Sequence, residues 1–180
     1  MKKIILSIAL IGSLIGGYGY YHYGYQASDH DHIHSYDNAH DREFFKRLFN
    51  DHFYLLTANP DTSIDFILDE KAPNPYEPRY FGKLEIKILR EQASQVGFVC
   101  YYMLSQYVGR ILFLCIDKSM QGKRYGEKLV KHAVQDLKNR GAQLIRVWCR
   151  VDNPNGRKFY ERLGFINSGI EGMIDYRLKI

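Results

Sequence analysis

The spacing of apolar residues changes partway along the chain, and this change constrains the fold more than any other feature. Residues 82–91 alternate apolar and polar side chains, as a half-buried strand does. Apolar strand-like runs follow at 94–104 and 108–116, and the short joins between the three favour antiparallel hairpins. From Tyr125 onward, apolar residues recur every three or four positions instead, which predicts a helix.

Further elements are predicted on both sides of this hairpin region. Phenylalanine and leucine recur at helical spacing over 41–56, which indicates a first helix. A strand is predicted at 143–151, followed by a helix that Asn153 caps and Pro154 begins. The last residues close the chain with one or two strands. This order predicts a mixed α/β fold: a mostly antiparallel central sheet flanked by helices, with one strand–helix–strand crossover.

The N-terminal part divides into an apolar and a polar segment. In residues 1–25, Lys2 and Lys3 precede an apolar run that a tyrosine-rich run follows. This is the layout of a signal peptide or membrane anchor. Residues 26–40 are rich in histidine and aspartate and predict a flexible linker. Such histidines can capture a transition metal, but their spacing matches no structural zinc site, so no metal site is predicted. The folded domain is expected over 41–180.

Charge and cysteine content narrow the class of ligand. The net charge of +5 and a pI near 9.0 suit acidic ligands, whereas scattered basic residues without a recognition motif argue against nucleic acid. Cys100, Cys115 and Cys149 each lie in an apolar run. Their odd number and the absence of a CxxC spacing argue against a disulfide framework, so we expect buried packing residues.

The stretch SMQGKRYGEKL at 119–129 lies where an apolar strand gives way to a helix. The first N–H groups of a helix have no partner within it and carry partial positive charge. Gly122 and Gly126 would let a ligand approach the backbone, and Lys123 and Arg124 add cations. The stretch therefore suits a pyrophosphate, although by itself it is equally consistent with a surface loop. It has neither P-loop nor dinucleotide-fingerprint spacing.

Together with VDNPNGRKFYERLGF at 151–165, this stretch resembles the GNAT superfamily of acyl-CoA-dependent N-acyltransferases. The family's phosphate-binding pattern is Arg or Gln, two residues, Gly, one residue, then Gly or Ala. Gln121 and Gly126 match its ends, and Arg124 stands where the family has its middle glycine. The second segment matches the family through Asn153, Gly156, Phe159, Tyr160, Glu161, Gly164 and Phe165.

The resemblance implies a GNAT-like sheet with a V-shaped splay between the fourth and fifth strands, here 108–116 and 143–151. It implies transfer of an acetyl group from acetyl-CoA to a primary amine by direct attack. The acceptor would be an amine-bearing small molecule or protein. A non-catalytic CoA-binding or interaction module on the same fold is the alternative, and Arg124 motivates it.

Residue roles follow from the same resemblance. The Leu114 N–H would face the thioester oxygen, and Tyr160 would protonate the leaving thiolate. Two carboxylates at strand ends are candidates for the general base: Asp117, beside the expected thioester, and Glu85. The residues expected to bind acetyl-CoA are Leu114, Ile116, Gln121, Gly122, Lys123, Arg124, Tyr125, Gly126, Asn153 and Arg157.

The sequence gives two conflicting indications of where the protein is located. A signal or anchor predicts a membrane-associated or exported protein, with residues 4–25 in the membrane. Acetyl-CoA and free cysteines instead indicate a reducing compartment that contains CoA.

Overall fold

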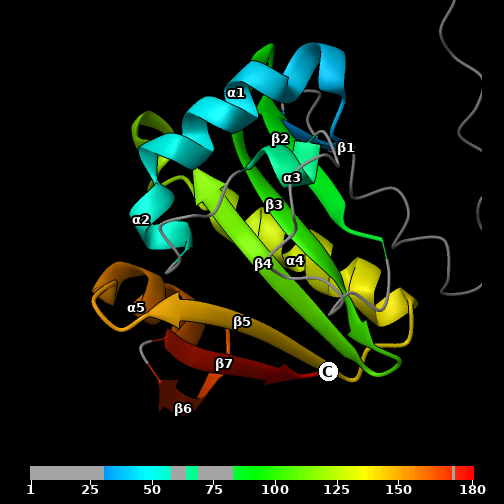
Figure 1. The fold of residues 1–180 in the computed structure, drawn as a ribbon, viewed down its shortest axis with the longest axis vertical. Helices are drawn as coiled ribbons and strands as arrows, with labels where there is room; N and C mark the ends of the chain where they lie inside the picture. Colours follow the sequence, from blue (N-terminus) through cyan, green and yellow to red (C-terminus); the bar gives the residue numbers. More distant parts are fainter. Residues whose placement is uncertain (1–30, 58–63, 69–82, 172) are drawn as a thin grey trace, which may run out of the picture.

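The structure is a computed structural model that describes residues 31–57, 64–68, 83–171 and 173–180 (Figure 1). Seven strands among these residues form one sheet in the order β1-β2-β3-β4-β5-β7-β6. The strands are β1 (Asp31–Ser35), β2 (Glu85–Glu91), β3 (Ser94–Ser105), β4 (Val108–Ile116), β5 (Leu144–Arg150), β6 (Ile166–Glu171) and β7 (Met173–Lys179). Neighbours are antiparallel except β4 and β5, which run parallel. The predicted mixed, mostly antiparallel sheet is confirmed.

Helices cover both faces of this sheet. They are α1 (Asn38–Asp51), α2 (Phe53–Leu56), α3 (Asp65–Leu68), the 3-10 helix η1 (Lys118–Met120), α4 (Tyr125–Asn139) and α5 (Pro154–Arg162). α1 packs on β3 and β4 from one side and α4 from the other, while α5 lies against β5 and β6 (Figure 1). Asn153 caps α5 as predicted, since its side-chain oxygen accepts the Gly156 N–H at 2.9 Å.

Two apolar cores hold the sheet between α1 and α4. On the α1 side, Phe45 and Phe49 are fully buried, and the Phe45 ring centroid lies 4.3 Å from that of Phe98 on β3. On the α4 side, Leu129 and Leu137 are fully buried within the second core. Each such side chain contributes about 1.5–3 kcal/mol through burial. The middle of the sheet is therefore well packed and can hold a binding site at the end of its strands in a fixed position.

The predicted flexible linker is wrong for residues 31–40, because these residues form β1, the Asp37 cap and the start of α1. β1 pairs with β2 from Asp31↔Glu91 to Ser35↔Lys87. The sequence DHIHS is mostly polar and has no apolar alternation that would predict a strand. β1 forms because its backbone pairs with β2. The folded unit therefore begins at least ten residues before Asp41, and residues 26–30 lie outside the described part.

The predicted signal peptide or membrane anchor at residues 1–25 lies outside the described residues. Within residues 31–57, 64–68, 83–171 and 173–180, no helix has the length and apolar character needed to cross a bilayer. This finding gives no support to membrane association through residues 4–25, and the predicted membrane-associated localisation is corrected accordingly.

Candidate active site

β4 and β5 are paired along only part of their length. Their parallel register ends at Ile111↔Val147, and beyond this point the two strands diverge (Figure 1). The pairing of β4 with β3 skips Leu112, which lies between the paired residues Ile111 and Phe113. Because an extra residue bends a strand and increases its twist, this bulge turns β4 away from β5 where their pairing stops. The V-shaped splay is confirmed.

The divergence leaves backbone groups of β4 directed into the gap. The Asp117 N–H donates to the Val96 carbonyl at 2.9 Å. Since hydrogen-bonded positions alternate along an antiparallel pair, Leu114 and Ile116 direct their N–H and C=O groups away from β3. The Ile116 carbonyl accepts the Gln121 Nε2–H at 3.1 Å. The Leu114 backbone can therefore pair with an extended ligand, as an added strand would.

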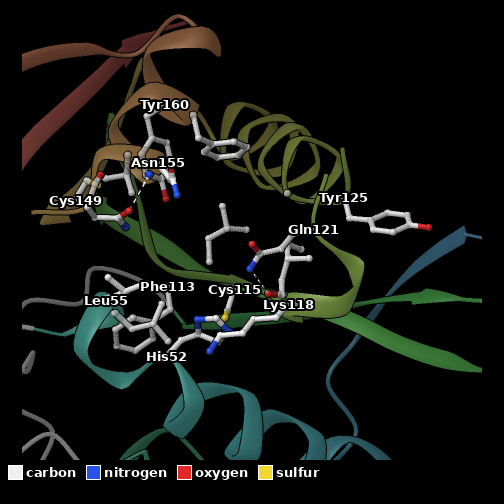
Figure 2. A pocket seen from close by; sticks show the side chains of 18 of the residues that line it. His52, Leu55, Phe113, Cys115, Lys118, Gln121, Tyr125, Cys149, Asn155 and Tyr160 are labelled. Carbon is white, nitrogen blue, oxygen red and sulfur yellow. Dashed lines mark hydrogen bonds between the residues drawn. The ribbon is translucent and has the colours of Figure 1, made fainter. Parts of the chain in front are cut away.

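A cleft of about 1230 Å³ occupies this splay. Figure 2 shows Tyr160 of α5 and Cys149 of β5 on one wall, with His52 and Leu55 on the opposite wall. The start of α4 closes one end of the cleft. The residues predicted from the sequence that line it are Leu114, Ile116, Gln121, Gly122, Arg124, Tyr125, Gly126, Asn153 and Tyr160.

The start of α4 has the properties of an anion site. Gly122 has φ +84°, and a Cβ added there would meet no atom within 4 Å, so its backbone is open to a ligand. Within the described part of the chain, the amides of Gly122, Lys123, Arg124 and Gly126 donate no backbone hydrogen bond. Unpaired amides at a helix start bind phosphate well. The residues present therefore fit the diphosphate of acetyl-CoA.

Arg124 has φ +64° and ψ 15°, a left-handed conformation that glycine adopts freely. For another residue this conformation costs roughly 1–2 kcal/mol. The family's glycine at this position is thereby explained. The loop keeps the required backbone despite the arginine, whose side chain is exposed and lines the cleft.

Tyr160 is buried, with 8% of its surface exposed, and its ring packs at 5.6 Å from that of Phe165 and 5.9 Å from that of Tyr176. Burial raises the pKa of its hydroxyl well above the ordinary value, and the nearby Cys149 and Cys115 act in the same direction. The phenol is therefore neutral at physiological pH and available as a proton donor.

Asp117 and Glu85, the predicted base candidates, do not line the cleft. The Asp117 carboxylate caps η1, accepting the Ser119 hydroxyl at 2.7 Å, and it also accepts Arg47 Nη2 at 3.0 Å. Its bonds to Ser119 and Arg47 hold the pKa of this carboxyl below its usual value. Glu85 lies 3.1 Å from Arg140. Both carboxylates thus have structural partners and lie outside the cleft lining.

Lys123 and Arg157, predicted to bind acetyl-CoA, also lie outside the cleft lining. Lys123 Nζ lies 3.7 Å from Glu91 Oε2 on β2. Arg157 Nη1 donates to the Val151 carbonyl at 3.4 Å. Both cations therefore have partners on the protein itself.

Sequence reasoning missed the wall formed by α2 and the α1–α2 junction. The apolar period predicts one continuous helix over 41–56, but α1 ends at Asp51, and His52 separates it from α2. His52 is 9% exposed, and burial lowers the pKa of its imidazole below 6.5, with Lys118 adding to this effect. In the sequence His52 directly follows Asn50 and Asp51, and this polar run does not by itself indicate a site.

A polar bridge connects α2 to the segment after β5. The Tyr54 hydroxyl donates to Asp152 and accepts Arg150 Nη2 at 2.8 Å. The Arg150 guanidinium also stacks 3.9 Å from the Tyr54 ring centroid. This Tyr54–Arg150–Asp152 bridge spans the cleft and joins its two walls, and Trp148 lines the cleft nearby on β5.

Comparison with known proteins agrees with this architecture. The model of the acetyltransferase (GNAT) family matches residues 41–165, and the chain therefore belongs to that family. It is 44% identical over 57 residues to N-alpha-acetyltransferase 30 of Schizosaccharomyces pombe, which covers 32% of this chain and 38% of the relative. It is 33% identical over 76 residues to an uncharacterized N-acetyltransferase of Methanocaldococcus jannaschii, which covers 39% of this chain and 34% of the relative. The matches thus span about a third of each curated relative.

The fold is also found among solved structures. The PaiA N-acetyltransferase of Thermoplasma acidophilum, solved in complex with coenzyme A, superposes with a TM-score of 0.67 at 16% identity. The superposition covers 83% of this chain and 99% of that chain, so the two share their fold.

Proposed function

We propose that this chain transfers an acetyl group from acetyl-CoA to a primary amine by direct attack of the amine. One observation carries the proposal: the start of α4, the free backbone of Leu114 and the buried hydroxyl-bearing Tyr160 all line one continuous cleft. This arrangement suits a long donor substrate with a diphosphate at one end and a thioester at the other.

Different residues of the splay would bind different parts of this donor. The amides at 122–126 would hold the diphosphate, and the Leu114 backbone would pair with the amides of the pantetheine arm. Gln121 fixes the corner between β4 and α4 through its bond to Ile116. Asn153 caps α5 and thereby holds Tyr160 in the facing wall.

Acetyl-CoA supplies an activated acyl carbon when it is bound. The amine lone pair forms a C–N bond to this carbon while the carbonyl π electrons move to oxygen, where the Leu114 N–H donates. A preorganised donor of this kind contributes about 2.7–4 kcal/mol in other enzymes. As the C–S bond breaks and its electrons leave with sulfur, the Tyr160 O–H donates its proton to that sulfur.

The cysteines of the cleft support direct transfer over a covalent acyl-cysteine route. Cys115 and Cys149 both line the cleft. Burial raises the pKa of Cys115 to about 12 and that of Cys149 to about 11. The thiolate is the nucleophilic form of cysteine, and at neutral pH these thiols stay protonated.

The acceptor would reach the thioester from the side of α1 and α2. The Schizosaccharomyces pombe relative is an N-alpha-acetyltransferase, which makes the α-amine of a polypeptide the first acceptor class to test. The alternative, a non-catalytic CoA-binding module, gains no support from Arg124, since the loop keeps the glycine-type backbone there.

Two measurements test the proposal. Trp148 is the single tryptophan of the chain and lines the cleft, so its fluorescence should change saturably when acetyl-CoA is titrated. CoA release is then followed with a peptide bearing a free α-amine, a peptide bearing only a free lysine, spermidine and 2-phenylethylamine. We expect binding and amine-dependent release. Binding without release from any amine would favour the non-catalytic module, and absence of both would refute the proposal.

A further inference from the structure

His52 lies at the break between α1 and α2, on the wall that faces Tyr160 (Figure 2). Its backbone N–H bonds back to the Phe49 carbonyl at 3.2 Å, which ends α1 in a tight last turn. The imidazole then points into the cleft, toward the region of Cys115 on β4 (Figure 2). His52 and Tyr160 are thus titratable groups on opposite sides of the space where the thioester would lie.

His52 also lines a second, smaller pocket of about 250 Å³. The other residues of this outer pocket are Arg47, Leu48, Asp51, Asp117 and Lys118. His52 is therefore shared by the cleft and the outer pocket. A proton that reaches the imidazole from the cleft can leave on its other side, past the carboxylates of Asp51 and Asp117.

The surroundings of His52 favour its neutral form. Burial lowers the pKa of the imidazole, and Lys118 lowers it further, while Asp51 and Asp117 raise it less. The remaining titratable groups on the facing elements are Arg47, Tyr54 and Cys115. Opposite it, burial raises the pKa of Tyr160. At neutral pH the imidazole is therefore free to accept a proton and the phenol still carries one, which are the forms that a base and an acid need.

We propose that His52 is the general base of the acetyl transfer and delivers the amine proton to the outer pocket. This inference rests on the function proposed above. Once its lone pair has formed the C–N bond, the amine nitrogen is positively charged, and it loses one proton to the neutral imidazole. Tyr160 gives its proton to sulfur and regains one from solvent, and His52 returns its proton to solvent through the outer pocket. The products are the amide and the free thiol of CoA.

The central test compares His52→Gln with the matched control His132→Gln. His132 lies on α4, lines neither cavity, and burial lowers the pKa of its imidazole too. Using the fastest amine of the four above, we expect His52→Gln to lower kcat by about 100-fold or more, the usual contribution of general base catalysis. Acetyl-CoA affinity, read from Trp148 fluorescence, should stay within threefold. His132→Gln should keep kcat within twofold.

Two further readouts do not depend on the turnover rate of His52→Gln. NMR titration of the wild-type imidazole, assigned by its absence in His52→Gln, should give a pKa below 6.5, and kcat of the wild type should fall as pH drops through that value. In a His52→Gly variant, added imidazole should restore part of the rate.

The outcomes separate the two proposals. An active wild type whose kcat and acid-side profile survive in His52→Gln would overturn the base assignment alone. An imidazole that titrates above 6.5, or a His52→Gly variant without rescue, would also count against the base. A wild type that releases no CoA with any of the four amines would overturn the acetyl-transfer proposal, and the base assignment with it.

Discussion

The Asp41 carboxylate, fully buried in the first turn of α1, lies 2.9 Å from the Arg90 guanidinium on β2. The same carboxylate accepts Gln95 Nε2 at 2.7 Å and the Asp37 N–H at 2.9 Å, and it lies 3.0 Å from His34 Nε2 of β1. This cluster ties β1, β2, β3 and α1 together at one edge of the sheet.

Asp41→Asn should destabilise the protein by about 2–3 kcal/mol, because bonds to a charged group are lost and Arg90 keeps a charge without its partner. Urea unfolding followed by circular dichroism measures the change. Glu43→Gln, an exposed substitution two residues further along α1, serves as the control and should stay within about 0.5 kcal/mol. Equal stability of Asp41→Asn and wild type would show that the cluster contributes nothing.

The same carboxylate predicts a pH dependence. Burial alone would raise its pKa, but the bonds from Asp37, Gln95, Arg90 and His34 outweigh burial and lower the pKa to about 2. A depressed folded-state pKa stabilises the fold above the unfolded value near 3.8 and loses that contribution as pH falls toward 2. The unfolding free energy should therefore drop by about 2 kcal/mol more in wild type than in Asp41→Asn between pH 4 and pH 2. Parallel curves for the two proteins would contradict this.

Arg124→Gly should raise stability by roughly 0.5–1 kcal/mol, because relief of the left-handed strain exceeds the entropy that glycine adds to the unfolded chain. Lys123→Gly, at a neighbouring residue without positive φ, should destabilise instead. Acetyl-CoA affinity should fall severalfold in Arg124→Gly at low salt, because a cation lining the cleft is removed. Thermal unfolding and Trp148 fluorescence measure the two effects. A destabilised Arg124→Gly would show that the strain argument is incorrect.

Tyr160→Phe should lower kcat by about 100-fold with little change in acetyl-CoA affinity, because only the donated proton is lost. Tyr176→Phe is a suitable comparison: its hydroxyl donates to Glu161 at 2.7 Å and does not line the cleft. That variant should lose about 1 kcal/mol of stability and keep its turnover. If both variants turn over at the wild-type rate, Tyr160 contributes packing and does not act as the proton donor.

The parts of the structure that the sequence predicts are those whose signals are local. Three such signals depend only on residues close in the sequence: the Asn153 cap of α5, Gly122 before α4 and the apolar period of α4. The structure has all three at the expected positions. β1 was missed because its pairing with β2 and the bonds around Asp41 come from residues about fifty positions away. Asp117 follows the predicted strand, but the direction of its carboxylate depends on Ser119 and Arg47.

The bulge in β4 could not be predicted either. The run ILFLCI is apolar throughout, so its pattern does not show which residues face which side of the sheet. His52 was overlooked because helical periodicity carries on through the single-residue break.

The extra residue at Leu112 has a consequence for how acceptor preference can change. The opening between β4 and β5 is created by a backbone register, so replacing individual side chains along α2 or β5 leaves it open. On the proposed function, donor recognition would rely largely on main-chain amides and would tolerate mutation on the opposite wall. Deletion of Leu112 would do the reverse: Phe113 would follow Ile111 directly and keep its partner Cys100 and its face, so the bulge would be lost and β4 and β5 would be free to pair further and close the cleft.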